Sequence, residues 1–170
     1  DNTLLNHNKA ESRSHEVVYS SFPVLQENTL DDWLEKYQEV NHNLWVRYQN
    51  DEIDRDEMHH SRFHDTMVEM NIPTDSSREI SESYMTQYME HWDWVKKAEE
   101  TIKLVKQSFD VGIITNGFKE TQIKKFEKLE MNRFTDQMVI SEELGVLKPD
   151  PKVFDYATEL AGVPRDEILY

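Results

Sequence analysis

A short apolar run that ends in a turn places the strongest constraint on how this chain folds. Residues Val111-Gly112-Ile113-Ile114 form a continuous apolar segment, typical of a strand covered on both faces, and Thr115-Asn116-Gly117 follows as a turn signal. The elements predicted after it alternate: a helix over 119–129, a strand over 138–140, a helix opened by Asp150-Pro151, and a third strand from Ile168. This order predicts a parallel sheet with covering helices, an α/β fold.

The part of the chain before this run is helical by the spacing of its apolar residues. From Leu30 to Tyr48 these residues recur at the intervals of an amphipathic helix, and further helices are predicted over about 54–71, 76–92 and 95–105. Thr29, Asp54 and Ser76 each precede an acidic residue three positions later, as in a capping box. A helical block over about 12–95 therefore precedes a strand-rich block.

Composition narrows the classes of partner. The 170 residues carry a net charge of -15, which repels nucleic acid backbones and anionic lipid, so we expect neither nucleic acid nor membrane as a partner. Small phosphorylated molecules remain possible, because one Lys and a few N–H groups outweigh the global field locally. The chain has no Cys and no apolar run near the ~20 residues that span a bilayer, which favours a reducing, cytoplasmic location.

Two polar residues lie where an open parallel sheet binds ligands, beyond the carboxyl ends of its strands. Thr115 ends the first predicted strand, and its hydroxyl with the following N–H groups is suited to phosphate oxygens. Lys148 precedes the helix opened by Asp150 and brings a point charge for the same anion. Taken alone, a Thr after a strand is usually a turn residue and a lone Lys is usually a solvated surface charge.

Their order and spacing change this interpretation, because they resemble the motifs of the haloacid dehalogenase superfamily of phosphatases. That family reads D-x-D-x-T, then an apolar strand ending in T/S-N-G, then a Lys before a helix, then a strand ending in an acidic G-D pair. The matching segments here are Asp1-Asn2-Thr3, Thr115-Asn116-Gly117, Lys148-Pro149 and Ile168-Leu169-Tyr170. The last is similar to the strand that leads to the fourth motif, which the chain does not reach.

A closer resemblance, to the noncanonical pyrimidine nucleotidase branch of this superfamily, extends through the helical block. It is carried by four segments: Asn41-His42-Asn43-Leu44-Trp45, Glu52-Ile53-Asp54-Arg55-Asp56-Glu57, Arg62-Phe63, and residues 139–149 with the sequence VISEELGVLKP. The resemblance implies a Rossmann-like core made of residues 1–11 and 96–170, and a mobile helical cap over residues 12–95 that closes over the core and reads the leaving group.

The resemblance also implies a role for each matching residue. Asp1 is the expected general acid and base, and its backbone carbonyl is an expected ligand of Mg²⁺. Thr115, Asn116 and Gly117 are expected to bind the phosphoryl group, and Lys148 to hold the nucleophile and neutralise charge. The aspartate nucleophile belongs two residues before Asp1 and the fourth-motif acid beyond Tyr170. We therefore expect these 170 residues alone to be an inactive fragment.

The leading hypothesis is a Mg²⁺-dependent 5′-nucleotidase, a monomer or homodimer that acts on pyrimidine nucleoside monophosphates. A general small-metabolite phosphatase and a 2-haloacid dehalogenase of the same fold are alternatives, as is a non-catalytic binding module. Dehalogenases of this superfamily lack an acid at the position of Asp1, because halide leaves without a proton, so Asp1 favours phosphate esters.

Two further clusters have simpler interpretations. Aromatic residues at helical spacing tempt a base-stacking role but more often form a core. These residues are Trp33, Trp45, Tyr48, Trp92 and Trp94. His59, His60 and His64 suggest a metal site, but no arrangement of carboxylates supports one, and we interpret them as part of a solvated helix face.

Overall fold

The computed structural model describes residues 2–170, which form two compact units. The helical unit consists of His7–His91. The strand-containing unit joins residues 2–6 to Trp92–Tyr170. The helical unit begins and ends a few residues before the range 12–95 expected from the sequence. The reason is that its first helix begins at His7 and its fourth long helix ends at Glu90.

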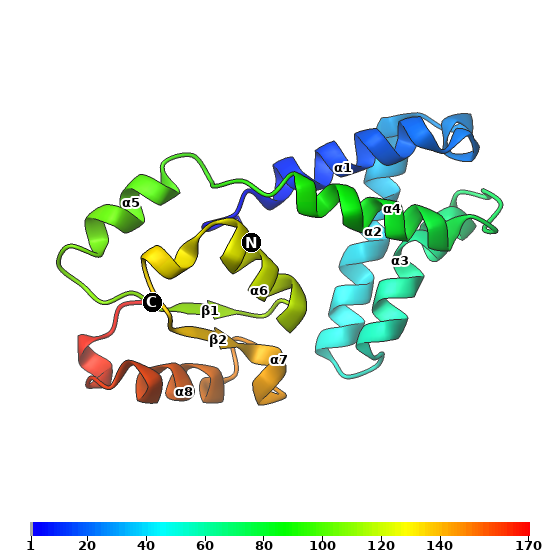
Figure 1. Ribbon diagram of the computed structural model, residues 1–170. Helices are drawn as coiled ribbons and strands as arrows, with labels where there is room; N and C mark the ends of the chain where they lie inside the picture. Colours follow the sequence, from blue (N-terminus) through cyan, green and yellow to red (C-terminus); the bar gives the residue numbers. More distant parts are fainter. Residues whose placement is uncertain (1) are drawn as a thin grey trace. The chain divides into compact units, whose positions relative to one another are not determined.

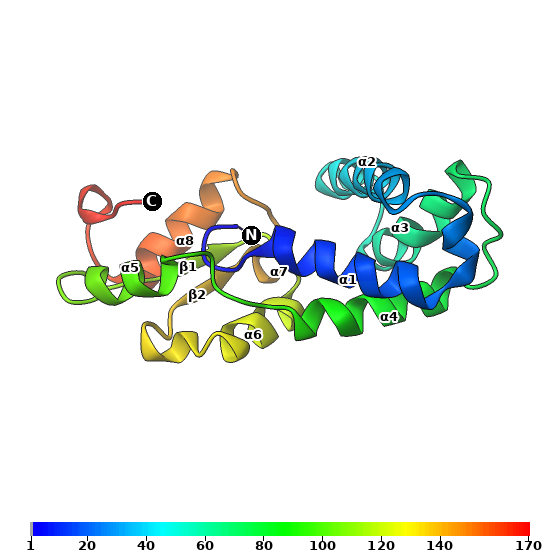
Figure 2. The ribbon, with the colours of Figure 1, turned by 90° about the horizontal axis from the view of Figure 1, so that it is seen from above.

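The helical unit contains four long helices and one short 3-10 helix. Helix α1 runs alongside α4, and α2 runs alongside α3 (Figures 1 and 2). The elements are α1 (His7–Ser21), η1 (Pro23–Glu27), α2 (Leu30–Gln49), α3 (Arg55–Glu69) and α4 (Ser77–Glu90). No helix in residues 2–170 combines the length and apolarity needed to cross a bilayer.

Aromatic rings fill the interior of the helical unit. Trp33, Tyr37 and Phe63 have no exposed surface, and Tyr84 retains only 2%. Their rings surround the buried imidazole of His15, whose centroid lies 4.2 Å from that of Tyr37 and 4.7 Å from that of Tyr84. Trp33 is therefore a core residue, as its helical spacing predicts.

Two of the three predicted capping boxes have a capping hydrogen bond at the helix N-terminus. The Thr29 hydroxyl accepts a hydrogen bond from the Asp32 N–H at 3.1 Å, and the Asp54 carboxylate accepts one from the Glu57 N–H at 2.8 Å. The prediction for Ser76 was wrong, because its side chain makes no capping bond. Its backbone, at ψ 5°, is not extended like that of Thr29 at ψ 157°, so the hydroxyl is not directed at the helix N–H groups.

The strand-containing unit has a parallel two-stranded sheet, as predicted. Ile113 pairs with Met138, Ile114 with Val139 and Thr115 with Ile140. Figures 1 and 2 both show α6 and α8 on opposite sides of the strands. The elements are α5 (Ala98–Val105), β1 (Ile113–Thr115), α6 (Lys119–Lys128), η2 (Met131–Arg133), β2 (Met138–Ile140), α7 (Ser141–Leu144), α8 (Pro151–Ala161) and η3 (Arg165–Glu167).

Two expectations about strands were wrong. Residues Ile113–Thr115 are half-exposed rather than covered on both faces, because β1 has only one neighbouring strand, β2, in the part of the chain that the structure describes. Ile168 begins no third strand within residues 2–170. Its backbone is extended, at φ -103° and ψ 129°, but a strand also requires a hydrogen-bonded neighbour, and residues 168–170 pair with none.

Candidate active site

The carboxyl ends of β1 and β2 lie next to each other and carry the polar residues singled out in the sequence. The strand pairing ends with Thr115 beside Ile140, so Asn116 and Ser141, the next residues of the two strands, leave the sheet at the same edge. Hydrogen bonds bring the loop of Lys148 to this edge from more than thirty residues along the chain. The structure thus brings Thr115, Asn116, Gly117 and Lys148 together.

Thr115 and Gly117 form a tight turn at the end of β1. The Thr115 hydroxyl accepts a hydrogen bond from the Gly117 N–H at 3.2 Å and donates to no acceptor within residues 2–170, so its proton remains for a ligand. A Cβ atom on Gly117 would lie 2.1 Å from Nε2 of Gln122, so any other residue would displace that side chain. Because only the flexible end of the Gln122 side chain would have to move, the space around Gly117 does not by itself require Gly.

The side chain of Asn116 is occupied by the neighbouring backbone and a hydroxyl. Its Oδ1 accepts hydrogen bonds from the Lys148 N–H and from the Ser141 hydroxyl, both at 2.8 Å. Its Nδ2 donates to the Lys148 carbonyl at 3.0 Å. Only the second N–H of this amide is left to contact an anion, so the side chain mainly ties the Lys148 loop to β1.

The ammonium group of Lys148 is held at the same edge by neutral groups. Its Nζ donates to the Ile114 carbonyl at 3.0 Å and to the Tyr170 hydroxyl at 2.7 Å. Lys148 forms no ion pair with any residue that the structure describes. An ammonium group without a carboxylate partner beside a free hydroxyl proton is an arrangement that attracts an anion.

The two acidic residues that follow Ser141 are engaged by Lys119. The Glu142 carboxylate accepts a hydrogen bond from the Lys119 N–H at 2.6 Å, and Glu143 pairs with the Lys119 ammonium at 2.5 Å. The hydrogen bond to Glu143 raises the pKa of the Lys119 ammonium. These contacts fix α7 to the start of α6, and no carboxylate within residues 2–170 pairs with the Lys148 ammonium.

Residues 1–170 match the family model described as Haloacid dehalogenase-like hydrolase. The chain belongs to this family. The protein is therefore a haloacid dehalogenase-like hydrolase with a small parallel sheet, and the edge formed by the ends of β1 and β2 is where the family resemblance places its chemistry.

Similar proteins of this family differ in the activities that their names state. Pyrimidine 5′-nucleotidase YjjG of Escherichia coli is 34% identical over 160 residues, which cover 89% of this chain and 70% of that protein. The (S)-2-haloacid dehalogenase of Pseudomonas putida is 28% identical over 111 residues, covering 64% of this chain and 46% of that protein. The chain thus spans part of the length of each.

A solved structure with the same fold contains a metal ion. The crystal structure of the HAD-hydrolase YfnB of Bacillus subtilis, bound to magnesium, superimposes with a TM-score of 0.80 at 25% identity. The match covers 97% of this chain and 71% of that one. That magnesium-bound structure also reveals interdomain movement in YfnB.

The described residues do not by themselves supply a magnesium site in this hydrolase. Within residues 2–170, no group of three or more His, Asp or Glu side chains is arranged to hold a metal ion. Asp1, the expected general acid whose backbone carbonyl is the expected ligand, lies outside the described residues.

The three histidines of α3 are far in sequence from the residues at the ends of β1 and β2. They line a separate pocket. A pocket of about 270 Å³ in the helical unit is formed by α3 and α4, with His59, His60 and His64 on one side and Ser77 and Ser81 on the other. The His60 Nδ1 bonds to the Asp56 carbonyl at 2.7 Å, and the His64 Nδ1 to the Asp65 carboxylate at 2.9 Å.

Sequence reasoning missed one residue of the edge, Ser141. It is fully buried and its hydroxyl contacts Asn116 directly. A Ser after a predicted strand has no feature that distinguishes it from an ordinary helix-capping residue, so only the register of β1 against β2 reveals the contact.

Proposed function

We propose that this hydrolase is a Mg²⁺-dependent phosphatase that releases phosphate from pyrimidine nucleoside 5′-monophosphates. The observation that carries the proposal is the Lys148 ammonium, which has no carboxylate partner among the described residues and lies at the strand edge that also bears the free Thr115 hydroxyl proton. Both groups suit a phosphate dianion. The similarity to a protein named pyrimidine 5′-nucleotidase supports the substrate class.

In this proposal, Thr115 donates a hydrogen bond to a phosphate oxygen, and Lys148 offsets charge on the phosphoryl group and on the attacking carboxylate. Asn116 keeps the Lys148 loop in place and has one amide N–H left for the phosphoryl group, while the Gly117 N–H donates to the Thr115 hydroxyl and holds the turn. The family resemblance assigns nucleophilic attack to an aspartate two residues before Asp1, with an aspartyl phosphate as intermediate.

The chemistry then divides into two displacements. The carboxylate oxygen of that aspartate bonds to phosphorus, the bond to the ester oxygen breaks, and the leaving alkoxide takes a proton from Asp1. Water next attacks the phosphorus of the aspartyl phosphate and gives a proton to Asp1. The bond between phosphorus and the aspartate oxygen breaks, so phosphate is released and the carboxylate nucleophile is restored. In the same proposal the helical unit is the cap that excludes water and reads the leaving group.

The assignment of Mg²⁺ rests on the family resemblance and not on ligands among the described residues. When bound, the ion screens the repulsion between two anions, the carboxylate nucleophile and the phosphate. The magnesium-bound crystal structure of YfnB supports this assignment. We expect EDTA to abolish turnover and added Mg²⁺ to restore it.

Dehalogenation is the second candidate, because (S)-2-haloacid dehalogenases are among the similar proteins. In a dehalogenase, halide leaves without needing a proton, so an acid at position 1 has no task there. The presence of Asp1 in the sequence therefore favours the phosphatase.

The test is a substrate panel with the full-length protein and Mg²⁺. Phosphate release from dUMP and dTMP is compared with release from sugar phosphates, and halide release from a 2-haloacid is measured in parallel. We expect the two nucleotides to be preferred. A preference for sugar phosphates would contradict the nucleotide assignment, and halide release without phosphate release would contradict the phosphatase itself.

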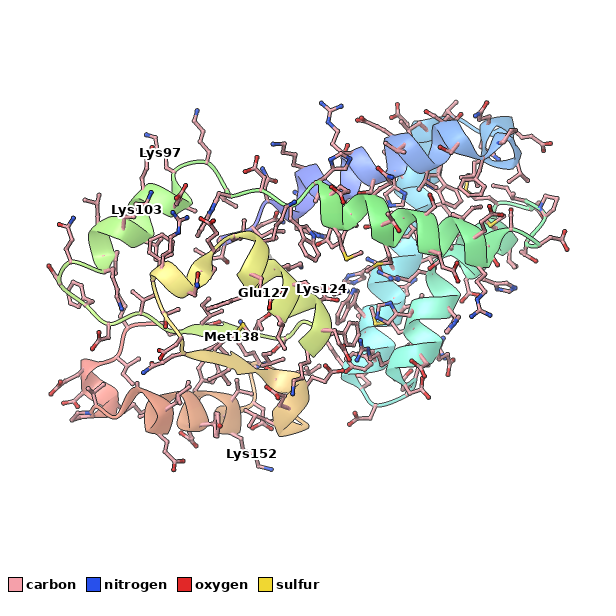
Figure 3. The ribbon with its side chains drawn as sticks, viewed as in Figure 1. Lys97, Lys103, Lys124, Glu127, Met138 and Lys152 are labelled. Carbon is pink, nitrogen blue, oxygen red and sulfur yellow. The ribbon has the colours of Figure 1, made fainter. Side chains whose placement is uncertain are left out.

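A matched pair of lysine variants connects this activity to the proposed site. Lys148→Met should lower kcat by about 10²–10³, the usual effect of removing one group that stabilises charge in the transition state. Lys152→Met, four residues later on an exposed part of α8 that points away from the sheet (Figure 3), should retain activity. Equal activity of the two variants would remove Lys148 from the mechanism.

A further inference from the structure

We propose that Ser141 is a positioning residue that sets the location of Lys148 through the side chain of Asn116. The inference rests on the proposed function, in which Lys148 acts on the phosphoryl group. Its basis is a chain of three hydrogen bonds that runs from the end of β2, through the end of β1, to the Lys148 loop.

The Asn116 amide holds Lys148 at two points. Its Oδ1 accepts the Lys148 N–H at 2.8 Å while its Nδ2 donates to the Lys148 carbonyl at 3.0 Å. Both backbone groups of one residue are thus matched by one planar amide, which requires Oδ1 and Nδ2 to face in defined directions. A rotation of the amide breaks both bonds together.

Ser141 supplies the contact that fixes this amide. Its hydroxyl donates to Asn116 Oδ1 at 2.8 Å, so this oxygen has both of its lone pairs engaged, one by Ser141 and one by Lys148. The Ser141 hydroxyl proton has no second acceptor within the described residues, and the side chain is fully buried. Water therefore does not readily replace this bond if it is lost.

The residues at the two ends of this hydrogen-bond chain are attached to the strands of the sheet. Ser141 directly follows Val139 and Ile140 of β2, which are each 3% exposed, and Asn116 directly follows β1. The ammonium end of Lys148 is in turn held by the Ile114 carbonyl at 3.0 Å. Both ends of Lys148, backbone and ammonium, are therefore fixed to β1, and Ser141 acts only on the backbone end.

Removal of the Ser141 hydroxyl should loosen the backbone end. Ser141→Ala leaves a buried amide oxygen short of one partner, and we expect kcat to fall by about 5–10-fold, the equivalent of one ordinary buried hydrogen bond. KM should change little, because Thr115 and the phosphate contacts of the ground state remain. Thr158→Ala is the matched control, since the Thr158 hydroxyl bonds to the Phe154 carbonyl at 2.8 Å within α8 and has no link to Lys148.

A double-mutant cycle tests whether Ser141 acts through Asn116. If it does, Asn116→Ala already removes the contribution of Ser141 to kcat. The kcat of the variant with both substitutions should then match that of Asn116→Ala to within about twofold. If the two effects multiply, Ser141 acts by another route and the inference is overturned.

Chemical labelling tests the same link without requiring catalysis. The full-length protein is treated with an amine-reactive acylating reagent, and modification of Lys148 is compared with that of the exposed Lys152 by mass spectrometry. In Ser141→Ala the ratio should rise about fivefold, because a weaker backbone anchor lets the Lys148 loop leave β1 more often, and that opening also carries the ammonium away from the Ile114 carbonyl. Ser141→Cys, which nearly keeps the volume but donates weakly, should raise the ratio in the same direction.

The two experiments separate the inference from the proposed function. An unchanged labelling ratio in both folded Ser141 variants overturns the positioning role, whatever the activity. A raised ratio in a protein whose wild type releases no phosphate from any ester contradicts the proposed function, while the link from Ser141 to Lys148 stands.

Discussion

His15 is an ionisable residue enclosed by the aromatic interior of the helical unit. It has no exposed surface, and its Nδ1 accepts a hydrogen bond from the Trp33 indole N–H at 3.1 Å. The imidazole is therefore neutral, with its proton on Nε2, and Nε2 has no hydrogen-bond partner among the described residues. Burial, and secondarily the positive charge of Arg62, lower the pKa of His15 from 6.5 to about 3.

This shift predicts a loss of stability in mild acid. As the pH falls below 6.5, the unfolded chain takes up a proton on His15 while the folded chain does not until about pH 3. The free energy of unfolding should therefore drop by ~2 kcal/mol from this residue alone between pH 7 and pH 5. Glu11 acts in the opposite direction, because burial raises its pKa and its contribution to stability is lost as the pH rises.

His15→Gln isolates the contribution of the imidazole. Glutamine does not titrate but retains an acceptor for the Trp33 indole, so Glu11 and Arg62 act equally in both proteins. Urea unfolding followed by circular dichroism at pH 5 and pH 7 measures the change for each. The wild type should lose more stability than the variant on acidification; equal losses would show that His15 is charged in the fold or solvated.

The site residues show how far residue-scale prediction reaches. Strand order predicts Thr115 at the edge of a sheet, and the motif resemblance adds Lys148; in the structure the Lys148 ammonium bonds to Ile114, the residue before Thr115 on β1. The spacing of residues along the chain does not report which way an amide points. The bonds that occupy Asn116, and the buried hydroxyl of Ser141 that completes them, depend on the register between β1 and β2.

At the scale of elements, the N-termini of α2 and α4 offer a matched comparison. The Thr29 hydroxyl caps α2 through the Asp32 N–H, whereas the Ser76 hydroxyl before α4 caps nothing. Thr29→Ala should therefore lower the free energy of unfolding by about 1 kcal/mol, the usual value of a lost N-cap. Ser76→Ala should change it by less than about 0.5 kcal/mol, as for an ordinary surface substitution.

Urea unfolding of the two variants, measured side by side, checks this difference. A third variant, Asp54→Ala, should behave like Thr29→Ala, because the Asp54 carboxylate caps α3. If Ser76→Ala proves as destabilising as the other two, its hydroxyl caps α4 in solution and the geometry at ψ 5° does not hold.

Helix α1 shows where element prediction failed. The predicted helical block begins at about residue 12, but periodicity predicts no individual helix before Leu30, so α1, over His7–Ser21, has no predicted counterpart. Its buried face consists of Ala10, Glu11, Ser14, His15 and Val18, so the usual apolar stripe is largely replaced by polar groups. Ser14 and Glu11 have partners within α1, the Ala10 carbonyl and the His7 imidazole. The partner of His15 is Trp33 on α2, a contact that becomes known only when the helices are packed.

The predicted strand at Ile168 failed for a complementary reason. An apolar run fixes the tendency of a segment to be extended, and Ile168 is extended. A strand in a parallel sheet also needs a neighbour that supplies the ladder of hydrogen bonds. Tyr170 instead packs edge-on against Phe154 at 5.1 Å and reaches Lys148 with its hydroxyl.

At the scale of the whole molecule, the charge of -15 opposes the proposed substrate, which is itself a dianion. The many acidic residues repel the substrate over long distances as it approaches, whereas Lys148 attracts it only at short range. The two respond differently to salt, because the Debye length falls from about 30 Å at 0.01 M to about 8 Å at 0.15 M ionic strength. Screening removes the distant repulsion first.

We therefore expect kcat/KM for a pyrimidine nucleoside monophosphate to rise about two- to fivefold when KCl is raised from 0.01 M to 0.15 M at fixed Mg²⁺. The value of kcat should stay nearly constant, because the bound substrate is already past the repulsive field. Initial rates over a range of substrate concentrations at each salt concentration give both quantities. A steady fall of kcat/KM with salt would mean that the positive edge at Lys148 governs the encounter, and that the acidic surface lies away from the path of the substrate.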